Sequence, residues 1–113
     1  GSVIQKIVYF NTDEAIVLAK SIIDLNEVVA YMNENAGAEL SVAGHTDNTE
    51  SDEYNMKLSE KRADYVIGYL KEKGLTNLNI VKEFFGESKP STDNSTAEGR
   101  ALNRRVVITI TKK

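Results

Sequence analysis

The chain has 113 residues, of which 41% are hydrophobic and 27% are charged, and its formal net charge is −3 at pH 7. This composition indicates one globular domain, and the acidic balance argues against a nucleic-acid-binding module, which usually needs a strongly basic face. No run approaches the roughly 18 apolar residues of a membrane span, no signal peptide is visible, and zero cysteines exclude disulfides. Gly1-Ser2 resembles a tag remnant, so we expect residues 3–113 to be a single domain cut from a longer protein.

The first 44 residues predict a strand, a helix and a second strand. Val3–Phe10 is rich in β-branched and aromatic residues, which favours a strand. A helix is expected to begin at Ser21, because Ser21 and Asp24 have the spacing of a capping box, and to end at Gly37. Residues 38–44 alternate between apolar and polar side chains, as a half-buried strand does.

The remaining residues predict a long helix, two strands and a short helical turn. The long helix covers about residues 52–73 and ends at Gly74. A strand is expected near 79–85, a turn capped by Ser95 with Glu98 follows, and the last strand runs over 104–111. The order β-α-β-α-β-(α)-β favours an α/β (α+β) sandwich, in which a mixed four-stranded sheet has helices packed on one face.

The stretch GHTDNTESDEYN at 44–55 holds the only histidine and four carboxylates within seven positions. It does not predict a metal site, because Thr49 and Ser51 stand where an EF-hand needs acidic or amide ligands, and one histidine without cysteine cannot build a typical zinc site. No Ser–His–Asp order or nucleophile elbow accompanies His45. We therefore expect no metal, no cofactor and no enzymatic activity, and a structural role for His45.

Arg62 is the most informative residue of the long helix. The half of the inward face that precedes it is polar, with Asn55 and Ser59, and an arginine beside a buried stripe needs a partner. Asp47 lies fifteen residues earlier, in the loop after the second strand. Two hypotheses follow: Asp47 and Arg62 form an internal salt bridge, or they bind the ammonium and the carboxylate of a zwitterionic ligand. Arg104 shares the packed face of the last strand by alternation, which favours a site, although strand-end arginines often extend to solvent.

Three motifs resemble one known family. GHTDNT at 44–49, YNxxLSxxRA at 54–63 and GRAxNRRVxI at 99–108 are similar to the OmpA-like C-terminal domain, and the turn at 86–90 and the Phe-Asx pattern at 10–13 fit as well. The resemblance implies a periplasmic domain that binds peptidoglycan non-covalently through the diaminopimelate of the stem peptide.

The resemblance also implies which residues bind. The family's ligand aspartate and arginine fall on Asp47 and Arg62, and Thr46, Asn55, Arg104 and Asp13 match positions that line the same pocket. One departure is Glu50, where the family often has glycine, and it adds negative charge at the rim. We expect the domain to anchor a membrane-bound envelope protein to the cell wall, at the periplasmic side of the outer membrane. The alternative is a periplasmic protein–protein interaction module with an internal Asp47–Arg62 salt bridge.

Overall fold

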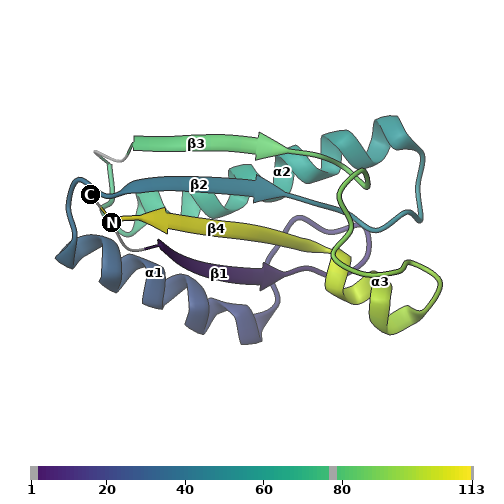
Figure 1. Ribbon diagram of the computed structural model, residues 1–113, viewed down its shortest axis with the longest axis horizontal. Coiled ribbons are helices and arrows are strands. Elements are labelled where there is room, and N and C mark those ends of the chain that lie inside the picture. The colour runs from purple at the N-terminus through teal and green to yellow at the C-terminus, as the bar shows by residue number, and fades with distance from the viewer. Residues whose placement is uncertain (1–2, 77–78, 113) are drawn as a thin grey trace.

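The computed structural model describes residues 3–76 and 79–112, so the predicted tag remnant Gly1-Ser2 lies outside the described residues. A single four-stranded sheet runs through the molecule in the order β1-β4-β2-β3 (Figure 1). Its strands are β1 (Val3–Tyr9), β2 (Glu39–Gly44), β3 (Asn79–Phe84) and β4 (Arg105–Thr111). β4 pairs antiparallel with both β1 and β2, whereas β2 and β3 are parallel, so the sheet is mixed as predicted.

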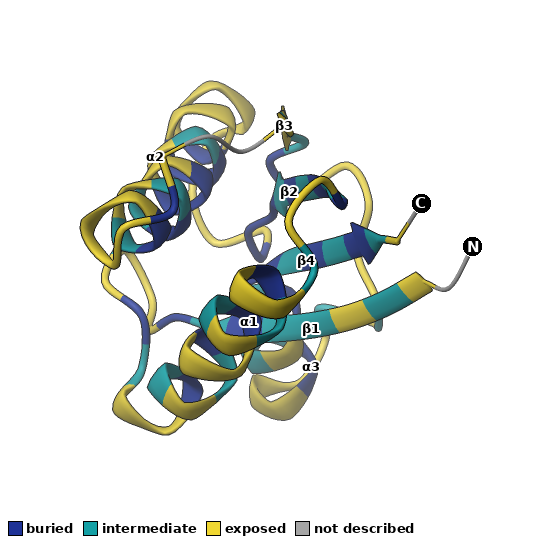
Figure 2. Cartoon of the chain, turned by 90° about the vertical axis from the view of Figure 1, so that its left-hand side faces the viewer, coloured by how far each residue is buried: buried dark blue, intermediate teal, exposed yellow. Residues whose placement is uncertain are grey.

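The two long helices cover one face of the sheet and leave the other uncovered (Figure 2). They are α1 (Ile22–Glu34), which follows a short 3-10 helix over Ala19–Ser21, and α2 (Asp52–Glu72). The third helix, α3 (Ala97–Asn103), lies beyond the end of the sheet where β1, β2 and β3 finish and β4 begins (Figure 1). We call this end of the sheet the loop end, because the connections after β1, β2 and β3 also lie there.

The hydrophobic core lies between the sheet and the two long helices. Alternate residues of β2 and β4 point toward the helices, as the period of two in a strand requires. The helices contribute residues three or four positions apart. The fully or nearly fully buried members are Leu40, Val42, Val106, Ile108 and Ile110 from the sheet, Leu25, Val28 and Met32 from α1, and Ala63, Val66 and Leu70 from α2.

The first half of α2 is polar on its inward face because it packs against backbone rather than against apolar side chains. A Cβ atom on Gly44 would lie 2.0 Å from the carbonyl oxygen of Ser59, so glycine lets the helix approach the end of β2. The Ser59 hydroxyl accepts a hydrogen bond from the Gly86 N–H at 2.9 Å. Asn55 donates to the Glu50 carbonyl at 3.1 Å and to Glu87 Oε1 at 2.9 Å. These contacts hold the loops at both sides of the helix start.

Four predicted details at the ends of elements are wrong, each for a local reason. Ser21 is the N-cap residue of α1, as predicted, but its side chain does not cap the helix, because its hydroxyl accepts a hydrogen bond from the Tyr9 N–H at 3.0 Å. α1 ends at Glu34 rather than at Gly37, and the side-chain amide of the following Asn35 donates to the Tyr31 carbonyl at 2.9 Å. The cap of α3 is Thr96 rather than Ser95, since the Thr96 hydroxyl accepts from the Gly99 N–H at 2.9 Å. Arg104 follows α3, and β4 begins one residue later than predicted.

Within residues 3–76 and 79–112, none of the helices combines the length and the apolar character that crossing a bilayer would require.

Candidate functional site

The segment His45–Thr49 leaves β2 at the loop end and is fixed by its own hydrogen bonds. The Thr46 N–H donates to the Gly86 carbonyl at 2.9 Å, and the Thr46 hydroxyl donates to the Asp47 carbonyl at 2.8 Å. The Thr49 N–H donates to Asp47 Oδ1 at 3.0 Å, which is the contact of an Asx turn. Thr46 and Asp47 are buried although they belong to a loop. The Asp47 carboxylate is therefore held in one orientation.

Arg104 is the ion-pair partner of Asp47. Its Nη1 lies 3.0 Å from Asp47 Oδ2, and the two side chains are 15% and 6% exposed. The Arg104 Nε donates to the Phe10 carbonyl at 3.0 Å, which ties the pair to the end of β1. Burial alone would raise the pKa of the Asp47 carboxyl, but the hydrogen bonds from Thr49 and the bond and charge of Arg104 outweigh it and hold this pKa below its ordinary value. Asp47 is thus ionised at neutral pH.

Arg62 is fully buried and donates to backbone carbonyls. Its Nε donates to Glu14 O at 2.8 Å, its Nη1 to His45 O at 2.9 Å and its Nη2 to Asn11 O at 3.0 Å. The guanidinium lies 5.1 Å from the centre of the Phe10 ring, within the range of a cation–π contact.

The charge on Arg62 is maintained by its neighbours. Burial lowers the pKa of Arg62 to about 10; the negative charges of Asp47 and Asp13 raise it, while the charge of Arg104 lowers it further. Even so, a pKa of about 10 leaves the guanidinium protonated at neutral pH. Its interactions with all three groups place Asp13, Asp47 and Arg104 within electrostatic range of one buried cation.

The hypothesis of an internal Asp47–Arg62 salt bridge is wrong for the described residues. Among the described residues, 3–76 and 79–112, Asp47 forms an ion pair with Arg104 and none with Arg62. The buried guanidinium of Arg62 needs no carboxylate in contact with it, because three peptide carbonyls accept its hydrogen bonds. Phe10, Asn11 and Glu14 also take part through their carbonyls, which hold the two arginines. Their carbonyls carry no signal in the sequence, since every residue has one.

Asp13 and Asn55 lie on different sides of this group. Asp13 belongs to the exposed segment Asn11–Glu14, which passes over Arg62, and it has a positive φ of 59°. Its carboxylate accepts a hydrogen bond from the Tyr54 hydroxyl at the start of α2. Asn55 lies about two helical turns from Arg62 and contacts the turn at Glu87 instead. The structure thus brings Asp13, Asp47, Arg62 and Arg104 together, with Thr46 beside them, and directs Asn55 elsewhere.

The side chain of His45 lies outside this group. Its ring stacks on Phe85 at 5.4 Å between centroids. Burial, together with the positive charges of Arg105 and Lys89, lowers the pKa of His45 to about 4, so the ring is neutral at neutral pH. Across the described parts of the chain, no three His, Cys, Asp or Glu side chains are grouped so that they could hold a metal ion.

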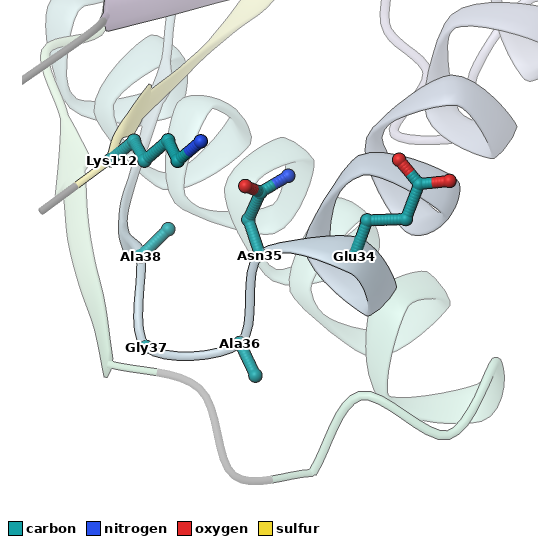
Figure 3. A pocket seen from close by; sticks show the side chains of 6 residues that line it. All are labelled: Glu34, Asn35, Ala36, Gly37, Ala38 and Lys112. Carbon is teal, nitrogen blue, oxygen red and sulfur yellow. The ribbon is translucent and has the colours of Figure 1, made fainter.

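A hollow of about 610 Å³ lies at the opposite end of the sheet (Figure 3). It is lined by Glu34, Asn35, Ala36, Gly37, Ala38 and Lys112. These are residues of the α1–β2 connection and of the segment after β4. The hollow is remote from Asp47 and Arg62, and its walls offer no buried charged side chain. We therefore assign the candidate site to the loop end, on chemistry rather than on the size of a hollow.

Comparisons with known proteins agree on one family. Residues 9–104 match the OmpA family. The chain is 40% identical over 99 residues to outer membrane porin F of Pseudomonas fluorescens, and 36% identical over 101 residues to the peptidoglycan-binding protein ArfA of Mycobacterium bovis. These alignments cover 88% and 89% of this chain but only 30% and 31% of the two relatives. The chain therefore spans less than a third of the length of either.

Solved structures agree on the fold. The crystal structure of the peptidoglycan-associated lipoprotein from Burkholderia pseudomallei superposes with a TM-score of 0.86 at 26% identity. The match covers 93% of this chain and 89% of that one. The mixed sheet with helices on one face, predicted from the pattern of elements, is thus also the fold of a solved relative.

Proposed function

The chain belongs to the OmpA family, and from this premise we propose that residues 3–113 form one domain that binds peptidoglycan non-covalently through the diaminopimelate of its stem peptide. The domain would anchor an envelope protein to the cell wall at the periplasmic side of the outer membrane. Two relatives support this proposal by name, one as peptidoglycan-binding and one as peptidoglycan-associated. The family is one of structural binding domains, and the protein is not an enzyme.

The observation that carries the proposal is the enclosed charge group at the loop end. One carboxylate, Asp47, and two guanidinium groups, Arg62 and Arg104, lie within electrostatic range of one another. The side chain of diaminopimelate ends in a carbon that bears both an ammonium and a carboxylate. A zwitterion of this kind needs one acidic and one guanidinium partner, which take the ammonium and the carboxylate respectively.

Binding would exchange one ion pair for two. Asp47 and Arg104 satisfy each other in the structure, and Arg104 is the more exposed partner. The carboxylate of an arriving zwitterion can bind Arg104 while its ammonium binds Asp47. Neither buried charge is then left without a partner. A lysine-type stem peptide has the ammonium but no neighbouring carboxylate, and it would leave a guanidinium unpaired. This asymmetry predicts selectivity for diaminopimelate.

Arg62 would support binding mainly through its charge. Three of its five N–H groups donate to carbonyls, which leaves one N–H on each terminal nitrogen. The exposed segment Asn11–Glu14 covers the guanidinium, so a ligand can reach these two donors only if that segment shifts. In either case the positive charge of Arg62 favours a carboxylate at this place.

The affinity of one site would be modest. A charge-assisted hydrogen bond contributes roughly 1.5–3 kcal/mol. Two or three of them, after the entropy lost on association, correspond to a Kd on the order of micromolar to millimolar for one stem peptide. The wall is a polymer that presents many such peptides, so many weak contacts at high local concentration would retain the protein.

Sedimentation with purified peptidoglycan tests the proposal. The wild-type domain is expected to pellet with the wall, whereas Asp47→Asn and Arg104→Gln should stay in the supernatant. Arg100→Gln is the matched control: it removes one positive charge from α3, where Arg100 donates to the Asn94 carbonyl, and it should pellet as the wild type does. Circular dichroism establishes that each variant is folded. A wild-type domain that remains in the supernatant would favour a protein–protein interaction module instead.

A further inference from the structure

We propose that Arg105, His45 and Lys89 form a second binding site, for a carboxylate group, on the face of the sheet that the long helices leave uncovered. This site does not rest on wall binding, because it uses none of the side chains that we assign to the diaminopimelate site; only the backbone carbonyl of His45 contacts Arg62.

The strand register places two of these residues side by side. Gly44 pairs with Val106 in the β2–β4 ladder, and the His45 N–H extends that pairing by donating to the Arg105 carbonyl at 2.9 Å. Gly44 and Val106 face the helices, so His45 and Arg105, the next residue on β2 and the preceding one on β4, point to the opposite face. Figure 2 shows that neither long helix covers this face.

Arg105 is a buried cation whose charge no carboxylate balances in the described residues. It is 7% exposed, and its Nη2 donates to the Lys89 carbonyl at 3.1 Å. None of the ion pairs formed by residues 3–76 and 79–112 includes Arg105. Burial lowers its pKa, and the one titratable neighbour that opposes this is Tyr9. The ammonium of Lys89 adds a second positive charge. Burying a cation without an anion is costly, so this place favours an anionic group.

In the described part of the chain, two buried side-chain nitrogen atoms remain without a hydrogen-bond partner: His45 Nδ1 and Arg105 Nη1. Both residues are more than nine-tenths buried. An unmade hydrogen bond at a buried polar atom costs about 1–3 kcal/mol. Both nitrogens can donate, the histidine when its ring carries the proton at Nδ1. Two donors can serve the two oxygens of one carboxylate, and this is the anion that we assign to the site.

The turn after β3 forms the wall of the site. Phe85 stacks on His45, and the Lys89 ammonium lies 4.2 Å from the centre of the Phe85 ring. Lys89 is exposed, so its side chain can move from the ring toward an entering anion. The charged and titratable groups that face His45 here are Arg105 and Lys89, with Tyr9 beside Arg105.

The only histidine of the chain supplies a direct readout. The pKa of His45 is followed by NMR on the whole chain, in formate, sulfate and chloride at equal ionic strength. Formate is a small carboxylate, and sulfate is the tetrahedral comparison. In chloride the pKa should be about 4. Formate should raise it toward the ordinary value of 6.5, because a bound anion offsets the charges of Arg105 and Lys89, and sulfate should raise it less.

Substitutions separate this site from a general effect of salt. Arg105→Gln should weaken formate binding roughly tenfold or more, since it removes the charged donor. Lys89→Gln keeps the buried arginine and should weaken formate binding less than Arg105→Gln does. This variant is the test if Arg105→Gln does not fold. Arg100→Gln should leave binding unchanged. The proposal is overturned if formate has no effect on His45, if sulfate has the larger effect, or if Arg100→Gln weakens binding as much as Arg105→Gln.

Discussion

The two ends of the sheet differ in the kind of side chain that they bury. At the loop end, α2 begins with Asn55, Ser59 and Arg62 on its buried face, and β2 leads into His45 and Asp47. At the opposite end, the buried face of α2 continues with Val66 and Leu70. There Leu40, near the start of β2, pairs with Ile110 of β4. One helix and one strand thus change from a polar to an apolar interior along their length.

Under the proposed function, this difference separates an end that stabilises the fold from an end that binds a ligand. Apolar packing at the opposite end needs no precise partner, whereas each buried charge at the loop end requires donors or acceptors in fixed places. A fold does not need Arg62, Asp47 and Arg104 in one corner to be stable, since well-packed apolar residues often replace buried ion pairs at no loss. Their presence therefore supports the proposed binding site at this end.

Among the substitutions at the loop end, Arg62→Met should have the largest effect on stability. It keeps much of the side-chain volume but leaves the carbonyls of Asn11, Glu14 and His45 without their donor. The expected loss in the free energy of unfolding is on the order of 3 kcal/mol or more, measured by urea denaturation.

Leu70→Ala at the opposite end should lower the free energy of unfolding by about 2–5 kcal/mol, and its folded fraction should still bind the wall. A loss below about 1 kcal/mol for Arg62→Met would show that the carbonyls do not depend on it.

Gly44→Ala should destabilise the protein by about 1–3 kcal/mol, because the new methyl group would lie against the Ser59 carbonyl where α2 crosses the end of β2. Urea denaturation measures this change as well. An unchanged midpoint would mean that α2 can withdraw from the sheet at no cost, and the loop end would then be less tightly built than we infer.

The pH dependence of stability should report His45. Its pKa is about 4 in the folded chain and 6.5 as an ordinary histidine, so between these values the unfolded chain binds more protons. Stability is therefore complete above pH 6.5 and falls as the pH drops toward 4, by at most about 1.4 kcal/mol per pH unit. Asp47 adds a loss only below its ordinary pKa of 3.8. His45→Gln should remove the slope between pH 4 and 6.5, and an unchanged slope would contradict this assignment.

Gly68→Ala is the smallest change and should be stabilising. Gly68 lies in the interior of α2, and a Cβ atom there would have no neighbour within 4 Å. Alanine favours the helix by roughly 0.5–1 kcal/mol over glycine. The contrast with Gly44→Ala, measured in the same denaturation series, would show that the two glycines of the region have opposite roles. A destabilising Gly68→Ala would contradict that view.

The sequence carried the fold because its signals are local. The alternation of apolar and polar residues predicted β2, and the spacing of apolar residues together with Gly74 predicted the extent of α2. The motifs also indicated which charged residues lie at the loop end. The pairing of those charges could not be predicted, since it depends on which elements meet in space. Arg62 finds the carbonyls of Asn11 and Glu14, and Ser21 finds the Tyr9 N–H instead of capping its own helix. Such partners leave no pattern along the chain.

The most direct test of the central claim is a calorimetric titration of the domain with a diaminopimelate stem peptide, beside its lysine counterpart. We predict saturable binding of the diaminopimelate peptide with a Kd on the order of micromolar to millimolar, weaker binding of the lysine peptide, and loss of binding in Asp47→Asn. Equal affinity for the two peptides, or binding that survives in Asp47→Asn, would contradict the account.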